Sequence, residues 1–159
     1  MVEDQRPKTK EHIYEVHRKI VTVINALEDR AKNHDASKLK SPEREIFDEY
    51  TPKLRDTTYG SDEYRDYLKE MKVALDHHYT NNRHHPEFFD RTNIGTTHWN
   101  PFKCMNLVDI NEMLCDWKAA TMRHADGDIR KSIEINQDRF NYTDQMKEIL
   151  LNTVESFGW

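Results

Sequence analysis

Apolar residues recur along most of the chain at intervals of three and four rather than at every second position. This spacing places them on one face of an α-helix. The first long segment shows it through Ile13, Val16, Ile20, Ile24 and Leu27. His17 falls within this stripe, so we expect the helix to turn both its apolar face and this histidine toward a core.

Two later segments open with signals that are typical of helix starts. In SPEREIFDEY, Ser41 is an N-cap candidate and Pro42 occupies the first helical position. In SDEYRDYLKEMKVALDHHY, Ser61 is the N-cap candidate, and apolar residues continue at helical spacing. This second segment predicts one helix that carries His77 and His78 at its C-terminal end.

The remaining chain follows the same helical pattern. The stretch TNNRHHPEFF is predicted to be a loop, because asparagines favour turns and Pro86 disfavours helical geometry at His85. A helix from about residue 105 to 124 and two shorter helices that end near Phe157 follow. With only four glycines and five prolines, the sequence predicts an all-α, single-domain bundle of about five to seven helices.

Length and charge narrow the class of protein. The chain has 159 residues, a net charge of −5 and a pI near 6.0, which fits one domain over residues 1–159. The acidic balance argues against an extended surface for nucleic acid or anionic membrane, but it permits a pocket for one small phosphorylated ligand. No apolar run approaches the roughly 20 residues that cross a bilayer.

The cysteines and the N-terminal residues indicate the cellular compartment in which the protein is expected to lie. Cys104 and Cys115 lie eleven residues apart, which matches neither a thiolate zinc site nor a disulfide framework. The N-terminal MVEDQRPKTK lacks the apolar core of a signal peptide. We therefore expect a cytoplasmic protein.

HHYTNNRHHPE, residues 77–87, holds four of the nine histidines as two adjacent pairs. They are His77, His78, His84 and His85. Histidine is the commonest side-chain metal ligand, so this cluster predicts either a metal site or a solvated polar loop. We expect about half of the four to contact metal or substrate and the others to support them. We expect His12, His98 and His124 to lie on the surface.

A second polar group lies in NHDASKLKSPE, residues 33–43. His34 and Asp35 are neighbours, and their side chains can converge on an ion at the edge of a helix. Lys38 follows His34 by four residues and would share its helical face. Its ammonium would then lie beside the ion, where it can hold a phosphate oxygen.

A third group lies in DINEMLCDWKAA, where Asp109, Glu112 and Asp116 are spaced by three and four. The spacing makes an acidic line along one side of a helix. Such a line can simply be solvated. We expect Glu112 to support a ligand or to lie on the surface rather than to bind an ion itself.

Together these motifs resemble the HD-domain superfamily of metal-dependent phosphohydrolases, over about residues 12–120. HDASKLKSP is similar to the HD-x-x-K-x-x-x-P string of the HD-GYP cyclic dinucleotide phosphodiesterases, and HHYTNNRHHPE is similar in part to their HH-E-x-x-x-G-x-G-Y-P segment. Tyr79 stands where that family has Glu, and the Gly-x-Gly-Tyr-Pro part is absent. More closely, HD-x-S-K, N-x-HHPE and EM-x-x-DW resemble a largely phage-encoded, HD-like family of unknown function.

The resemblance implies an HD-like bundle with a metal centre. Its inner ligands would be His17, His34, Asp35 and Asp116. A second ion would take His78 and one of His84 and His85. These nitrogen and carboxylate ligands suit one or two divalent ions of Mn, Fe, Co, Ni or Zn. Water bound to such an ion can ionise near pH 7, against roughly 15.7 for bulk water, and attack phosphorus.

Several residues are expected to act on the substrate. Asp35 is a natural bridge between two ions, and Lys38 and Arg83 would stabilise negative charge on the phosphoryl group. These three are the predicted catalytic residues. The predicted substrate-binding residues are Lys38, His77, Arg83, His85 and Lys118.

Three functions remain open at this level. The leading hypothesis is a metal-dependent phosphohydrolase, of nucleotidase or phosphodiesterase type, that cleaves a nucleotide or other small phosphate ester by a metal-activated water. The HD scaffold also resembles mixed-valent di-iron oxygenases that carry extra histidines. The third is a non-catalytic phage module that binds a nucleotide signal or a host factor in the host cytoplasm. We also expect a homodimer, because bundles of this size often pair through an exposed apolar helix face.

Overall fold

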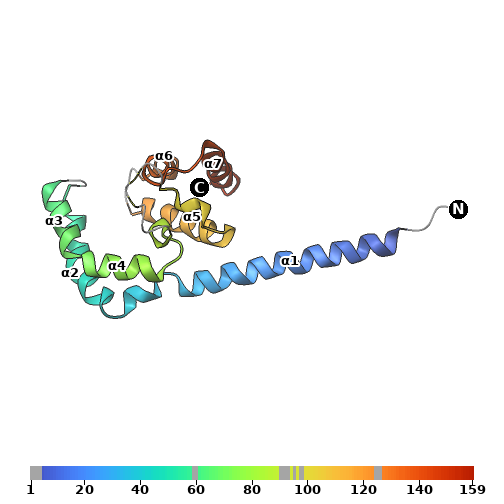
Figure 1. The fold of residues 1–159 in the computed structure, drawn as a ribbon, viewed down its shortest axis with the longest axis horizontal. Coiled ribbons are helices and arrows are strands. Elements are labelled where there is room, and N and C mark those ends of the chain that lie inside the picture. Colours follow the sequence, from blue (N-terminus) through green and yellow to red (C-terminus); the bar gives the residue numbers. More distant parts are fainter. Residues whose placement is uncertain (1–4, 59–60, 90–93, 95, 97–98, 124–126) are drawn as a thin grey trace. The chain divides into compact units, whose positions relative to one another are not determined.

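The described part of the chain is helical throughout its regular secondary structure. The computed structural model describes residues 5–58, 61–89, 94, 96, 99–123 and 127–159. These residues form seven α-helices and several short 3-10 helices, and they include no strand (Figure 1). The prediction of an all-α protein is confirmed. No helix in these residues is long and apolar enough to cross a membrane.

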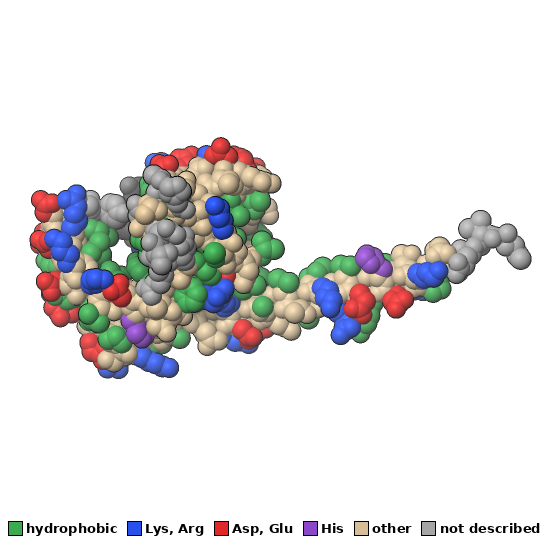
Figure 2. All heavy atoms as spheres, viewed as in Figure 1, with side chains coloured by type: hydrophobic (Ala, Val, Ile, Leu, Met, Phe, Trp, Pro, Cys, Tyr) green, Lys and Arg blue, Asp and Glu red, His purple; other side chains and the backbone are tan. Residues whose placement is uncertain are grey.

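The chain divides into two units, Met1–Asn33 and His34–Trp159. The described residues of the first unit form one long helix, α1 (Arg6–Asn33). It contains no buried residue, and Ile13 and Ile20 are 62% and 54% exposed. Figure 2 shows apolar side chains at the surface along this helix. The predicted helix is confirmed, whereas His17 and most of the stripe are exposed rather than buried in a core, and Leu27 is half-buried.

The described residues of the second unit form the remaining helices, which are shorter than α1. In chain order they are η1 (Ala36–Leu39), α2 (Glu43–Arg55), α3 (Asp62–Glu70), α4 (Lys72–Asn81), η2 (Pro86–Phe88), η4 (Pro101–Lys103), α5 (Leu107–Thr121), α6 (Ile129–Phe140) and α7 (Asp144–Ser156).

The helix starts agree with the sequence in part. The Ser61 hydroxyl accepts a hydrogen bond from the backbone N–H of Tyr64, so this N-cap is confirmed. The prediction at Ser41 is wrong, because α2 begins at Glu43 and Pro42 takes the N-cap position. The single helix predicted after Ser61 is also wrong. It breaks at Met71, a buried residue that ends α3 and precedes α4.

The apolar core of the second unit gathers around Phe140 at the end of α6. The Trp117 ring of α5 stacks on it at 6.1 Å, and Trp99 meets it edge-on at 5.5 Å. Buried residues of the same core come from α5, α6 and α7, including Met113, Ile133, Leu150 and Val154.

The HDASK motif and the two histidine pairs meet around helices α2 and α4 of this unit. Helix α2 packs against η1 and α4, and α4 packs against η1 and η2. These contacts bring the HDASK motif next to both histidine pairs, although about 40 residues separate them in the sequence.

Replacing Phe140 by Ala tests the core. The buried ring would leave a cavity, so we expect the free energy of unfolding to fall by about 3 to 5 kcal/mol. Urea unfolding followed by circular dichroism measures the loss. Ile135→Ala on the exposed side of α6 is the matched control and should change stability by less than about 0.5 kcal/mol. Equal losses in both variants would contradict the assignment of the core.

Candidate metal centre

Asp35 occupies the middle of the polar cluster in the second unit. It precedes η1 and has a left-handed backbone conformation, with φ of 55° and ψ of 16°. Aspartate tolerates this conformation better than most residues, because its short polar side chain can bond locally. The backbone N–H of Lys38 bonds back to the Asp35 carbonyl at 2.9 Å, which closes the turn. The turn directs the Asp35 carboxylate toward the two histidine pairs.

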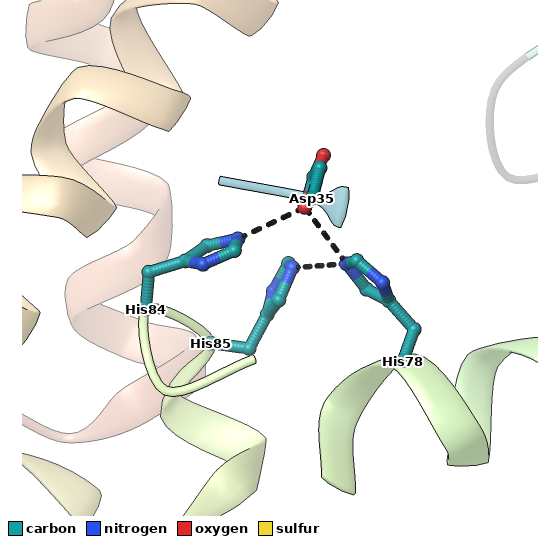
Figure 3. A group of neighbouring side chains, drawn as sticks. All are labelled: Asp35, His78, His84 and His85. Carbon is teal, nitrogen blue, oxygen red and sulfur yellow. Dashed lines mark hydrogen bonds and ion pairs between the residues drawn. The ribbon is translucent and has the colours of Figure 1, made fainter. Parts of the chain in front are cut away.

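The first donor set faces the Oδ1 atom of Asp35. The Nε2 atoms of His78 and His84 lie 3.3 and 3.4 Å from this oxygen. His85 joins the set through its Nε2, which lies 2.8 Å from the Nε2 of His78. Figure 3 shows the three imidazoles and the carboxylate pointing toward one another. His78 comes from the end of α4, whereas His84 and His85 come from the turn before η2.

The spacing of these atoms fits a shared cation. Ligands that bind one ion at 2.0 to 2.2 Å, at angles of 90 to 110°, lie about 2.8 to 3.6 Å apart. Three of the six distances within the first set, 2.8, 3.3 and 3.4 Å, fall within this range, and the donor atoms of the set all lie within 4.8 Å of one another. The buried atoms Asp35 Oδ1 and His84 Nε2 also make no hydrogen bond with any described residue. Buried polar atoms normally have partners, and a cation would supply one to both.

The second donor set faces the other oxygen of Asp35. His34 Nε2 lies 3.6 Å from Asp35 Oδ2 and 3.7 Å from Asp116 Oδ1 on α5. The Lys38 ammonium lies 2.6 Å from the same Oδ2. Asp35 therefore contacts one donor set with each oxygen, as the predicted bridging ligand would. Lys38 reaches this position through the tight turn of η1 and not, as predicted, by sharing a helical face with His34.

Two glutamates lie behind the imidazoles. Glu43, the first residue of α2, is fully buried, and its carboxylate oxygens lie 2.6 Å from His77 Nδ1 and 2.8 Å from His78 Nδ1. Glu112 on α5 places Oε1 3.0 Å from His34 Nδ1 and 3.1 Å from His84 Nδ1. A carboxylate behind a metal-binding histidine fixes the orientation of the ring and makes it a better ligand. Glu43 was not predicted from the sequence, because its position just after Pro42 indicates only a helix start.

The charges of the cluster set the protonation states of its possible ligands. The carboxylates of Asp116 and Glu112 raise the pKa of His34 to about 10, against the effect of burial. Burial acts to raise the pKa of Asp35, but the His78 imidazole and the Lys38 ammonium outweigh it and lower this pKa. Burial and the neighbouring histidines lower the pKa of His85 to about 3. At neutral pH, His85 is therefore neutral and Asp35 is charged, which are the states that bind metal.

The side chain of Arg83 contacts Asp109 on α5. Its guanidinium forms a bidentate ion pair with Asp109, at 3.0 and 2.9 Å. Asp109 also closes the capping box at the start of α5, where it accepts a hydrogen bond from the backbone N–H of Asn106. These contacts fasten the turn that carries His84 to α5. The predicted role of Arg83 at the phosphoryl group stays a prediction, and Lys38 is the cation that lies beside Asp35.

The other predicted residues belong to neither donor set. His77 faces Glu43 rather than Asp35. Lys118 follows Asp116 by two residues in α5, about 200° around the helix. His17 lies on α1 in the first unit. Their predicted roles stay predictions. His12 is exposed, as expected, whereas His98 and His124 lie outside the described residues.

Fold and site together define an all-α protein in which four histidines and two aspartates form a candidate metal centre. The model of DUF5662, a family of unknown function, matches residues 1–156, so the chain belongs to this family. No curated protein and no solved structure is similar enough to be matched with the chain.

Metal binding should depend on pH through His34. Its raised pKa, about 10, means that the ring carries a proton at neutral pH and must release it to bind an ion. Protons compete with the metal, so we expect the affinity for Mn²⁺ at the site that includes His34 to rise by up to about tenfold per pH unit between roughly pH 7 and 8.5. Isothermal titration calorimetry in buffers of different ionisation enthalpy measures both affinity and proton release. His34→Gln is expected to lose this dependence, and a natural protein whose Mn²⁺ affinity is independent of pH would contradict it.

Proposed function

We propose that the protein is a metal-dependent phosphohydrolase that acts on a nucleotide or another small phosphate ester. The observation that carries this proposal is the position of Asp35, whose two oxygens face two donor sets and whose Oδ2 also contacts the Lys38 ammonium. Two adjacent sites for cations with a further positive charge beside them suit a phosphoryl group, which carries negative charge on several oxygens.

The residues fit divalent transition metals. One ion would be held by Asp35, His78, His84 and His85, and a second by Asp35, His34 and Asp116. These sets combine imidazoles with carboxylates and contain no thiolate, which suits Mn, Fe, Co, Ni or Zn in a reactive rather than a structural centre. A bound ion of this kind lowers the pKa of water toward about 7 and polarises a phosphoryl oxygen.

The chain supplies the remaining chemistry through Lys38. Its side chain is about one third exposed, at 35%, so it reaches both the Asp35 carboxylate and the solvent. An ammonium in this position can donate a charge-assisted hydrogen bond to a phosphoryl oxygen. Negative charge that builds up during cleavage of the ester P–O bond is then stabilised by a group already in place. We propose a cytoplasmic location, in the host if the protein is phage-encoded.

A di-iron oxygenase is the second candidate for the same centre. The observation that favours it is the number of imidazoles, since four histidines lie in the two donor sets with only two aspartates. Imidazole ligands suit iron as well as zinc and nickel. Iron content, oxygen consumption and a di-iron spectroscopic signal distinguish this reaction from hydrolysis. The remaining alternative, a non-catalytic module, predicts a tightly bound nucleotide that is recovered intact.

Replacing Asp35 by Asn tests the proposal most simply. The variant removes the charge that both donor sets share, so we expect phosphate release from a panel of nucleotides and phosphate esters to fall at least about 100-fold. The assay uses protein reconstituted with Mn²⁺ and measures released phosphate. Asp138→Asn, at an exposed position of α6, is the matched control and should keep full activity. Undiminished turnover by the Asp35 variant would exclude the proposed role.

Replacing Lys38 by Gln separates substrate binding from metal binding. Loss of one charge-assisted hydrogen bond to the phosphoryl group should lower kcat/KM by about 10- to 100-fold. Bound metal, measured by mass spectrometry, should stay unchanged. Lys40→Gln, on the same turn but exposed, serves as the control. An unchanged kcat/KM for the Lys38 variant would remove this residue from the mechanism.

A further inference from the structure

Glu112 serves two imidazoles with one oxygen atom. Its Oε1 lies 3.0 Å from the Nδ1 of His34 and 3.1 Å from the Nδ1 of His84, and the two rings lie 4.4 Å apart. The Glu112 side chain is 8% exposed and that of His84 only 1%, so the contact between them is shielded from water. A charged carboxylate only accepts hydrogen bonds. The contact to His34 is a hydrogen bond, and at 3.1 Å the Nδ1 of His84 is also placed to donate a hydrogen to Glu112.

A hydrogen on Nδ1 determines which ring nitrogen is left for a metal. A neutral imidazole carries one hydrogen, so a proton held on Nδ1 leaves the lone pair on Nε2. The Nε2 of His84 faces Asp35 Oδ1, in the first donor set. The Nε2 of His34 faces Asp35 Oδ2 and Asp116, in the second set. The two rings that share Glu112 thus belong to different donor sets.

Glu43 contacts fewer of the possible ligands than Glu112 does. Of the residues in the two donor sets, it contacts His78, through the Nδ1 atom at 2.8 Å. Its other imidazole contact, His77, belongs to neither set. The Ser37 hydroxyl donates a further hydrogen bond to Glu43 at 3.0 Å. Glu43 therefore acts on the first donor set, whereas Glu112 acts on both.

We propose that Glu112 is a positioning residue that couples the two halves of the metal centre, by holding the Nδ1–H groups of His34 and His84 so that each presents Nε2 to an ion. The proposal rests on the metal centre of the proposed function, but not on the reaction that the centre performs. Glu43 has the same positioning role for His78 alone.

Zinc-loaded protein gives the most direct test, because zinc is diamagnetic. Long-range ¹H–¹⁵N NMR spectra of protein labelled on histidine distinguish a ring that binds metal through Nε2 from one that binds through Nδ1. We expect both His34 and His84 to carry hydrogen on Nδ1 and to bind Zn²⁺ through Nε2. A ring of either residue that binds through Nδ1, or that leaves the ion unbound, would overturn the proposal.

Metal affinity gives the second test, through variants that remove the acceptor. Glu112→Leu should weaken Zn²⁺ binding by about 10- to 100-fold in both halves of the centre, whereas Glu43→Leu should do so in the first half only. Glu112→Gln keeps an oxygen that can accept both hydrogen bonds, so we expect it to recover part of the affinity. Glu134→Leu, at an exposed position of α6, should bind like the natural protein.

Thermal unfolding of the metal-free variants separates positioning from folding. A positioning role predicts that Glu112→Gln and Glu112→Leu have similar melting temperatures but different affinities for zinc. Equal zinc affinity in natural protein and Glu112→Leu would reject the role of Glu112 and leave the proposed hydrolase intact. Natural protein that binds no zinc would instead reject the metal centre itself, and with it both proposals.

Discussion

The carboxylate of Asp35 is the constraint on which the polar half of the second unit depends. A largely buried charge is tolerated only where opposite charge or polar groups compensate it. The chain meets this condition with the Lys38 ammonium on one oxygen and with imidazole nitrogens of His34, His78 and His84 around both. Two atoms of this arrangement, Asp35 Oδ1 and His84 Nε2, still lack hydrogen bonds from the described residues. A cation would complete it.

The surrounding contacts keep these side chains in place. The turn that carries His84 is tied to α5 by the ion pair between Arg83 and Asp109, and Asp109 also takes part in the capping box at the start of α5. The same helix carries Glu112, which lies behind the imidazoles of His34 and His84. Helix α5 thus carries both the capping-box residue Asp109 and the carboxylate of Glu112 behind two imidazoles.

Local patterns predicted what depends on local contacts. Helical spacing and capping residues predicted the all-α fold and the cap at Ser61, and the HD pair with Asp116 indicated part of the candidate centre. The break at Met71 was missed, because burial of that side chain depends on tertiary packing. Glu43 was missed for the same reason, since it meets His78 across 35 positions of sequence. The apolar stripe of α1 predicted a buried face, but spacing alone does not determine what covers it.

We propose that Asp35 and the histidines around it hold a metal ion. Metal content, measured by inductively coupled plasma mass spectrometry on tag-free protein and on Asp35→Ala, tests it most directly. The account predicts one or two equivalents of a transition metal per chain in the natural protein and a clear loss in the variant. No bound metal in the natural protein, even after reconstitution with Mn²⁺, Fe²⁺, Co²⁺ and Zn²⁺, would contradict it.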